Sequence, residues 1–185
     1  MIDVAFVTTN PGKFREAREI LRPYGVRLRW LRRSLLEPQS DDLRAVAVAK
    51  ARSVPKRGGY VLVEDSGLFV RALNGFPGVY SAHFLELWGF PPVLKLLRDR
   101  PRGAAFRSVA ALRRGRTIRT FAGEVRGSIA PRAAGSGGFG YDPIFVPRGY
   151  RVTFAQLPAE AKNRLSHRGR SMRQVGRYLA RTSGR

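Results

Sequence analysis

Residues 60–82 read YVLVEDSGLFVRALNGFPGVYSA, and the interpretation of the chain starts from this stretch. It opens with four apolar residues, Tyr60 to Val63, and a short run of this kind, rich in β-branched residues, predicts a buried strand. Glu64 and Asp65 follow at once. A strand that leads directly into acids carries them to the rim of a sheet, where open α/β sheets bind ligands. We therefore expect a functional carboxylate pair at this position, in a chain with only 13 acidic residues against 35 basic ones.

The composition is that of an ordinary globular protein. A length of 185 residues with 43% hydrophobic residues predicts one domain over residues 1–185. No apolar run approaches the roughly 20 residues of a membrane span, and the N-terminus has the pattern of a strand rather than of a signal peptide. There is no cysteine, which excludes disulfides, thiol catalysis and cysteine-ligated zinc. We therefore expect a cytoplasmic protein that does not enter a membrane.

The formal net charge of +22 has three possible explanations. It could provide a nucleic-acid surface, attract a small polyanionic substrate, or reflect an arginine-rich proteome. The basic residues are spread along the whole chain, which is typical of a solvated surface. Lysine is used sparingly, so the few lysines are more informative than the many arginines.

A phosphate-binding arrangement is predicted near the N-terminus. An apolar strand over residues 2–8 leads through TTNPGK (8–13) into an amphipathic helix over residues 14–21. Asn10 is a favourable N-cap and Pro11 suits the first helical position. The free N–H groups and dipole of a helix start attract anions, and Lys13 adds a full charge. A plain capped helix is the alternative, and the glycine spacing rules out a Walker A loop.

The next segment contributes an isolated acid and a lysine. Residues 26–30 alternate in polarity and predict a half-exposed strand. Glu37 lies in the loop that follows. Ser40 is expected to cap a second helix that begins with Asp41 and Asp42 and carries Lys50.

The second half of the chain predicts further sheet and helix. Residues 81–88 and 92–98 have helical patterns, and residues 104–112 and 117–126 predict an antiparallel hairpin. The predicted fold class is α/β, with a mixed, partly antiparallel central sheet flanked by helices. The hairpin would extend this sheet or build a second lobe.

A glycine-rich stretch, AAGSGGFGYDP (133–143), precedes a strand expected at residues 144–146. Glycines on both sides of Phe139 would let the backbone approach a flat ligand on which the ring stacks. A flexible loop with a core phenylalanine is the alternative. Further on, a helix that opens at residues 158–159 carries Lys162, and SHR (166–168) starts a final helix that ends near residue 181. His167 could be a ligand contact or a structural histidine.

Together these motifs resemble the inosine triphosphate pyrophosphatase family, the XTP/dITP diphosphatases, over nearly the whole chain. The resemblance rests on TTNPGK, LEPQS (36–40), EDSGLFVRALNGFPGVYSA (64–82), FGYDP (139–143) and SHR, with Lys162 at the expected place before SHR. Each motif is modest alone, but five in the same order are specific. The chain departs from the family pattern at Thr9, at residues 38–40 and at Glu64, which bears on loop geometry and on which acid binds metal.

The resemblance implies a Mg²⁺-dependent hydrolase with two lobes and an active-site cleft between them. The expected reaction splits ITP, dITP or XTP between the α and β phosphates into a monophosphate and pyrophosphate, and so cleanses the nucleotide pool. Carboxylates suit Mg²⁺, and one of them can act as general base. The expected metal ligands are Glu37, Glu64 and Asp65, with Asp65 also the catalytic base. The expected substrate contacts are Thr8, Thr9, Asn10, Pro11, Gly12, Lys13, Lys50, Ser66, Phe139, Gly140, Tyr141, Asp142, Lys162, His167 and Arg168.

Base selectivity has a physical explanation within this resemblance. Hypoxanthine and xanthine present a 6-oxo acceptor, to which Lys162, His167 and Arg168 could donate. Adenine would leave these buried donors unpaired, which carries a large penalty. Guanine shares the 6-oxo group, and no residue of the sequence explains how its 2-amino group would be rejected.

Three alternatives remain open at this point. A Maf-type pyrophosphatase would act on other modified nucleotides, although it would lack the FGYD and SHR motifs. A basic nucleic-acid-binding protein would explain the charge, although no recognised nucleic-acid motif is present and we expect no specific nucleic-acid partner. A nucleotide sensor would bind without cleaving. By resemblance, the protein is also expected to form a homodimer.

Overall fold

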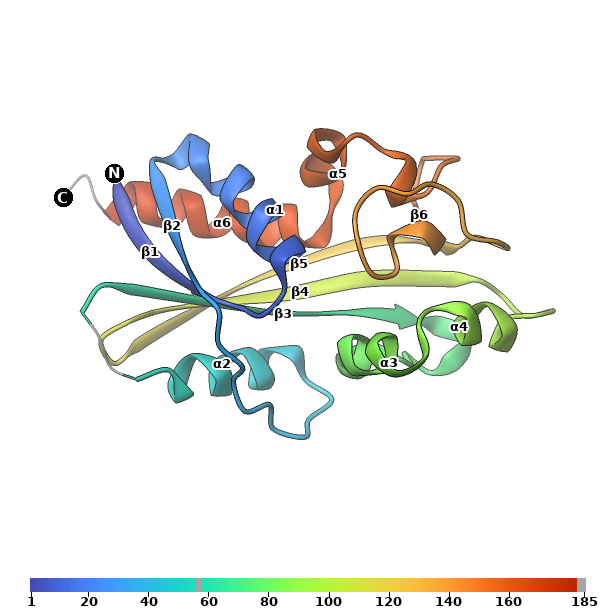
Figure 1. The fold of residues 1–185 in the computed structure, drawn as a ribbon, viewed down its shortest axis with the longest axis horizontal. Coiled ribbons are helices and arrows are strands. Elements are labelled where there is room, and N and C mark those ends of the chain that lie inside the picture. Colours follow the sequence, from blue (N-terminus) through green and yellow to red (C-terminus); the bar gives the residue numbers. More distant parts are fainter. Residues whose placement is uncertain (56–57, 183–185) are drawn as a thin grey trace.

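The computed structural model describes residues 1–55 and 58–182, and within them six strands pair in one sheet in the order β2-β1-β3-β4-β5-β6 (Figure 1). The pairings of β1 with β2 and with β3 are parallel, and all later pairings are antiparallel. This confirms the predicted mixed sheet, whereas the division into two lobes stays a prediction. The strands are β1 (Ile2–Val7), β2 (Val26–Leu31), β3 (Tyr60–Val70), β4 (Gly103–Arg114), β5 (Thr117–Ile129) and β6 (Phe145–Pro147).

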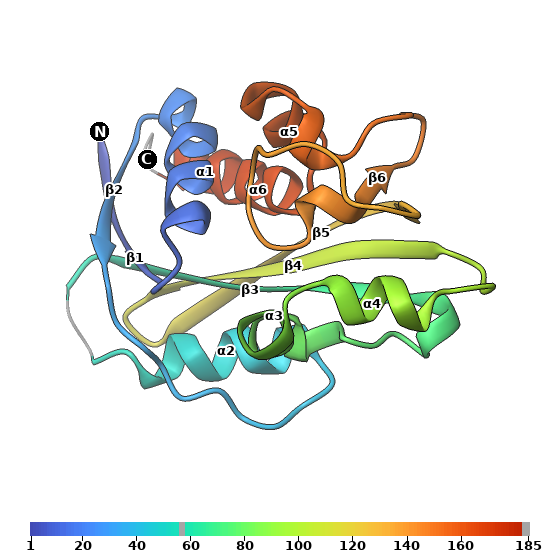
Figure 2. The same ribbon diagram turned by 45° about the vertical axis from the view of Figure 1, so that its right-hand side comes forward.

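α-Helices cover both faces of the sheet (Figures 1 and 2). One group, above the sheet in Figure 1, consists of α1 (Pro11–Leu21), α5 (Ala159–Leu165) and α6 (His167–Thr182). The other group consists of α2 (Leu43–Ser53), α3 (Ser81–Trp88) and α4 (Pro91–Leu96). Within the described part of the chain, none of the helices is both long and apolar enough to cross a membrane.

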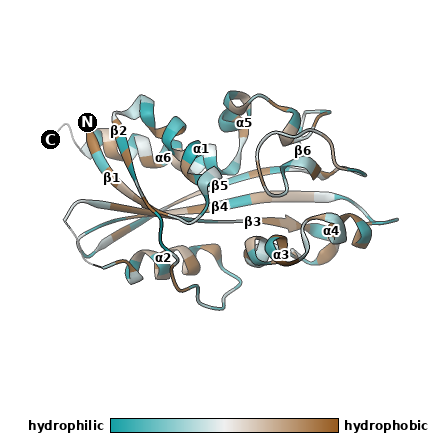
Figure 3. Ribbon diagram, in the orientation of Figure 1, coloured by the Kyte–Doolittle hydropathy of each residue, from teal (hydrophilic) through white to brown (hydrophobic). Residues whose placement is uncertain are grey.

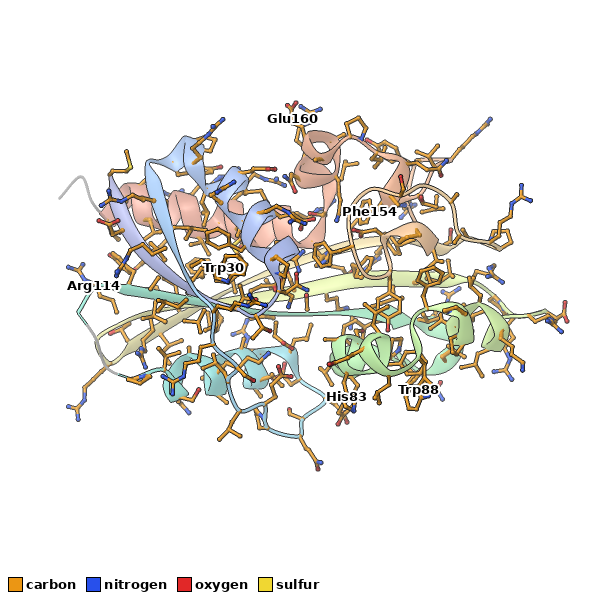
Figure 4. All side chains as sticks on the ribbon, viewed as in Figure 1. Trp30, His83, Trp88, Arg114, Phe154 and Glu160 are labelled. Atoms are coloured by element: carbon orange, nitrogen blue, oxygen red, sulfur yellow. The ribbon has the colours of Figure 1, made fainter. Side chains whose placement is uncertain are left out.

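The hydrophobic core divides between the two faces of the sheet. On one face, Phe6 packs in a cluster with Leu21 of α1 and with Met172 of α6. On the other face, Ala47 of α2 packs in a cluster with Val63. Figure 3 shows the hydrophobic segments that run along the strands, and Figure 4 labels Phe154, one of the fully buried aromatic residues. Each large apolar side chain that is fully buried in this way stabilises the fold by about 1.5–3 kcal/mol.

Two local predictions were wrong in their details. Asp42, not Ser40, caps α2, because its carboxylate accepts a hydrogen bond of 2.8 Å from the backbone N–H of Arg44. The strand expected at residues 144–146 begins one residue later, after a 3₁₀ turn at Asp142–Ile144. Pro143 has no N–H group to offer a sheet, so the turn accommodates it and β6 starts beyond it.

The acidic pair lies in the middle of a strand, which corrects the prediction that the strand ends there. β3 continues to Val70 because β4 pairs with it along its whole length. β1, however, pairs with β3 only as far as Leu62 and ends at Val7. Glu64 and Asp65 therefore lie just beyond the carboxyl end of β1, at the rim of the parallel part of the sheet. The two acids therefore still lie at a rim where a ligand can bind, but the rim is formed by the end of β1 and not by the end of β3.

Candidate active site

The start of α1 has the predicted capped geometry beside this rim. Asn10 adopts an extended backbone conformation, and its side-chain oxygen accepts a 3.0 Å hydrogen bond from the N–H of Lys13. The hydroxyl of Thr8 in turn accepts from the N–H of Asn10 at 3.1 Å. Pro11 occupies the first turn. These contacts fix the loop and aim the positive end of the helix dipole at the space beyond β1.

Glu64 and Asp65 contact opposite sides of the sheet, as adjacent strand residues must. Glu64 forms ion pairs with Lys13 of α1 at 2.9 Å and with Arg168 of α6 at 3.1 Å. Asp65 forms an ion pair with Lys50 of α2 at 2.6 Å. The two acids on β3 therefore form ion pairs with cationic side chains from the helices on both faces of the sheet.

The surroundings of the two acids shift their pKa values in opposite directions. Burial by itself raises the pKa of Glu64, but the charges of Arg168 and Lys13 outweigh burial and lower the pKa to about 2. Burial also raises the pKa of Asp65, and there Lys13 and Lys50 offset only part of the rise. Glu64 is thus a fixed negative charge, whereas Asp65 has the more basic carboxylate.

Glu37 joins the site through Lys50, at 2.7 Å, from an exposed loop in which 57% of its side chain is accessible. Within residues 1–55 and 58–182, no three His, Cys, Asp or Glu side chains lie close enough together to hold a metal ion. Mg²⁺ needs only one or two protein carboxylates, because it keeps several of its waters. Asp65 Oδ2 is buried and has no hydrogen-bond partner among the described residues, so the acids at this rim fit such a cation.

The ring of Phe139 lies between the glycine-rich loop and the start of α1. A Cβ atom on Gly12 would lie 2.5 Å from the Phe139 ring, so glycine at this position makes room for the ring. The ammonium of Lys162 lies 4.8 Å from the ring centroid and the guanidinium of Arg168 lies 5.4 Å from it. The structure therefore joins three predicted motifs that are far apart in the sequence.

Glu16 is a site residue that the sequence reasoning missed. Its two carboxylate oxygens accept hydrogen bonds of 2.6 Å from Lys162 and from Arg168. Burial raises the pKa of Glu16, but the charges of Arg168 and Lys162 outweigh burial and lower it. The available signal was its position one turn after Lys13 on α1, which puts both side chains on the same helix face.

Asp142, Tyr141 and Ser66 also make contacts within the protein that support the pocket. Asp142 accepts a hydrogen bond from the N–H of Phe139 at 2.7 Å and pairs with Lys162. The hydroxyl of Tyr141 donates to the carbonyl of Ser81 at 2.9 Å, and burial raises the pKa of Tyr141. The Ser66 hydroxyl accepts from Arg168 at 3.1 Å. Ser66 lines the same hollow as Asn10 and Lys13 of the predicted phosphate loop.

His167 is buried and stacks on Phe106, with ring centroids 4.7 Å apart and planes inclined by 11°. Burial, followed by the charge of Arg168, lowers its pKa well below the usual value, so the imidazole is neutral at pH 7. His167 Nδ1 and Arg168 Nε are buried without a hydrogen-bond partner among the described residues. Both residues line the same hollow, where unpaired polar atoms of this kind can meet a ligand.

Two adjoining hollows collect the predicted residues, and they share Asn10, Lys13 and Ala82. The first also contains Ser66, Phe139, Gly140, Tyr141, Asp142, Lys162, His167 and Arg168. The second also contains Thr8, Thr9, Pro11, Glu37, Lys50, Glu64 and Asp65. Gly12 lines neither hollow and instead backs the Phe139 ring. One hollow is thus lined by rings and donors, and the other by lysines and carboxylates.

Comparison with known proteins agrees with this arrangement. A sequence model of the Ham1 family matches residues 4–178. The chain belongs to the Ham1 family. A dITP/XTP pyrophosphatase of Thermococcus kodakarensis is 48% identical over 178 residues, which cover 95% of this chain and 96% of that protein. A dITP/XTP pyrophosphatase of Pyrobaculum aerophilum is 41% identical over 178 residues, 95% of each chain.

Solved structures of other Ham1 proteins have the same fold. The Ham1 protein of Coxiella burnetii superposes with a TM-score of 0.85 at 31% identity, covering 98% of this chain and 100% of that one. A dITP/XTP pyrophosphatase from Mycobacterium abscessus superposes with a TM-score of 0.69 at 35% identity, covering 98% and 97%. The mixed sheet and its helical layers are therefore those of this Ham1 family.

Proposed function

We propose that this Ham1-family protein hydrolyses deaminated purine nucleoside triphosphates, namely ITP, dITP and XTP, to the monophosphate and pyrophosphate. The observation that carries the proposal is the pair of adjoining hollows, one lined by aromatic rings and hydrogen-bond donors and the other by lysines and carboxylates. The dITP/XTP pyrophosphatases among its relatives support the same reaction. We further propose that residues 1–185 act as one domain, since the described strands share a single sheet.

The charged hollow suits a triphosphate tail. Lys13 and Lys50 each contact a carboxylate at 2.9 Å or less, and both line this hollow. A bound phosphate oxygen can replace a carboxylate as the partner of either ammonium. The capped start of α1 adds the positive end of its dipole on the same side.

Mg²⁺ is the proposed cofactor, and one or two of the three carboxylates Asp65, Glu64 and Glu37 would hold it. When bound, it would neutralise charge that develops on the phosphates in the transition state. The unpaired and buried Asp65 Oδ2 supports this assignment, because a buried carboxylate oxygen without a partner is costly unless a ligand satisfies it.

Asp65 is also the proposed general base. Its raised pKa makes it a better proton acceptor than Glu64, and Lys50 holds one of its oxygens at 2.6 Å. In this role the other oxygen, Oδ2, takes a proton from the attacking water, and Glu64 or Glu37 then holds the cation in its place. Glu64 stays ionised between Lys13 and Arg168, which suits an electrostatic role.

The ring-lined hollow suits the base. Phe139 offers a face for stacking, and the unpaired Nε–H of Arg168 is a donor for a 6-oxo group. Lys162 contributes a second positive charge beside it. A 6-amino group would place a donor against these donors, so ATP is expected to be rejected.

The products provide the direct test of the reaction. ITP is incubated with the protein and Mg²⁺, and the products are separated by anion-exchange chromatography. The proposal predicts inosine monophosphate and pyrophosphate in equal amounts. Inosine diphosphate and inorganic phosphate as first products would mean that the β–γ bond is cut, and the proposed reaction would be wrong.

We also propose a cytoplasmic homodimer. A pool-cleansing activity belongs where nucleoside triphosphates are used. The rings of Phe76, Phe84 and Trp88 pack together around α3, and the side chains of Phe76 and Trp88 remain exposed, that of Trp88 to 60% (Figure 4). Exposed aromatic clusters of this kind are typical of interaction surfaces, and this one supports the dimer.

A further inference from the structure

The outer face of α6 carries a row of arginines without acidic partners. Arg170, Arg173, Arg177 and Arg181 recur at intervals of three and four residues, which places them on one side of the helix. The residues Met172, Val175 and Leu179 face the core on the opposite side. The segment His167–Thr182 contains no Asp or Glu. We call the four arginines the α6 arginine face.

These positive charges are not neutralised by neighbouring elements. Among the described residues, no carboxylate forms an ion pair with any member of the α6 arginine face, and the nearby acids pair elsewhere. Glu124 of β5 pairs with Arg107 and Arg126, and Glu160 of α5 pairs with Arg164. Like charges spaced three and four residues apart destabilise an isolated helix. Arg170 and Arg173 offset part of this by donating to backbone carbonyls at the end of α5, at 2.8–3.2 Å, whereas Arg177 and Arg181 have no such contact among the described residues.

The neighbouring strand extends the same positive surface. The guanidinium of Arg119 on β5 lies 5.2 Å from the ring centroid of Tyr178 on α6. At the other end of the helix, Arg148 and Arg170 line one groove, together with Glu124 and its ion-pair partner Arg126. The surface therefore continues from the start of α6 along β5.

We infer that the α6 arginine face, with Arg119 and Arg148 beside it, binds the phosphate backbone of duplex nucleic acid without regard to sequence. From Arg170 to Arg181 the helix rises about 16 Å, which is long enough for several of these arginines to contact one duplex at the same time. Single-strand binders also stack bases on exposed aromatic rings. On this face the Tyr178 ring is covered by Arg119 and packs against Phe121, which favours a duplex.

This surface is separate from the proposed active site. Arg168, which precedes the row, is buried and belongs to the base pocket. Arg170, Arg177 and Arg181 are exposed and line neither hollow. Binding through this face would hold the enzyme near nucleic acid while the nucleotide cleft stays open.

The experiment compares two triple variants of equal charge. The first changes Arg170, Arg177 and Arg181 to Gln. The control changes Arg52, Arg98 and Arg100 to Gln, which are exposed and lie on or next to α2 and α4, across the sheet from α6 (Figure 1). Fluorescence anisotropy measures binding to a 30-base-pair duplex, as DNA and as RNA, from 50 to 200 mM salt. Melting temperature and pyrophosphate release from ITP are measured for each protein.

The inference predicts that the α6 variant binds duplex about a hundredfold more weakly at 0.1 M salt and that its salt slope is shallower by about 2.7, which is three phosphate contacts. The control should retain near wild-type binding, and all three proteins should release pyrophosphate equally. DNA and RNA duplexes should behave alike if only the backbone is bound. A strong preference for one of them would mean that more than the backbone charge is recognised, and would contradict the inference.

Several results would overturn the inference. Equal loss of affinity in both variants would mean that bulk charge alone attracts the duplex. Absence of duplex binding by the wild type would also refute it, as would binding to vesicles of anionic lipid but not to duplex. If the triple variant fails to fold, the double change of Arg177 and Arg181 is compared with that of Arg98 and Arg100, and the salt slope should then differ by about 1.8.

Discussion

Asp65 and Glu64 show how strongly the environment of a single carboxylate decides its chemistry. They are adjacent on β3, yet one pKa is raised and the other is lowered to about 2. The difference arises because Arg168 and Lys13 surround Glu64, whereas burial dominates at Asp65. When the pKa values of two neighbouring carboxylates are shifted in opposite directions, the one with the raised pKa can act as a base and the other stays ionised as an electrostatic group.

The change Asp65→Asn tests the role of base. It is nearly isosteric and removes the proton acceptor, so we expect kcat for ITP to fall by about 10²–10⁴. Nucleotide binding, measured by calorimetry, should persist because Lys13, Phe139 and Arg168 are unchanged. If kcat is unaffected, another group is the base. If the wild type itself shows no turnover but binds ITP, the protein is a sensor.

Glu16 is expected to hold the two cations of the base pocket in place. In Glu16→Gln, Lys162 and Arg168 each lose an ionised partner at 2.6 Å, and we expect the free energy of unfolding to fall by about 2–3 kcal/mol at pH 7. The folded-state pKa of Glu16 is lowered, so its contribution is present above the unfolded pKa and is lost as the pH falls through the folded value. Urea titrations at pH 7 and pH 4 should therefore show a larger difference between the proteins at pH 7.

At the scale of elements, the site depends on one strand ending before its neighbour. β1 stops at Val7, and this exposes the middle of β3 and leaves room for the start of α1. Much of this was predictable, because the cap at Asn10, the acids and the order of helices and strands are local signals. The full length of β3 was not, since its continuation to Val70 depends on pairing with β4, which follows more than thirty residues later.

Inside the pocket, too, contacts between distant parts of the chain limited what could be predicted from the sequence. The sequence indicated that Phe139, Lys162 and Arg168 belong together, and the structure brings them together around one ring. The role of Glu16 depends on side chains almost 150 residues away, and an exposed helix position would have the same local pattern. Likewise, nothing local in SHR reveals that His167 stacks on Phe106 and stays neutral.

Gly12→Ala tests the contact between α1 and the glycine-rich loop. The added methyl would meet the Phe139 ring at 2.5 Å and push it from its position, so we expect KM for ITP to rise about tenfold or more. Gly58→Ala is the matched control, because a Cβ there meets nothing within 4 Å. Similar KM values for the two variants would show that the position of Phe139 does not affect binding.

At the scale of the whole molecule, the exposed rings beside α3 test the proposed dimer. Trp88→Arg places a charge in an apolar contact, and we expect light scattering after size-exclusion chromatography to change from twice the mass of the 20.7 kDa chain to a single copy. Arg52→Glu on α2 alters an exposed residue away from this cluster and should leave the dimer intact. A wild-type monomer at micromolar concentration would contradict the proposal.

The central chemical proposal is that the cleft accepts a 6-oxo purine triphosphate and cuts it with the help of Mg²⁺. The direct measurement is kcat/KM for pyrophosphate release from ITP, XTP, GTP and ATP, with Mg²⁺ and with chelator. The account predicts fast release from ITP and XTP, little from ATP or GTP, and none with chelator. Equal rates for ATP and ITP would contradict the proposed base pocket, and release from no purine would contradict the proposed function.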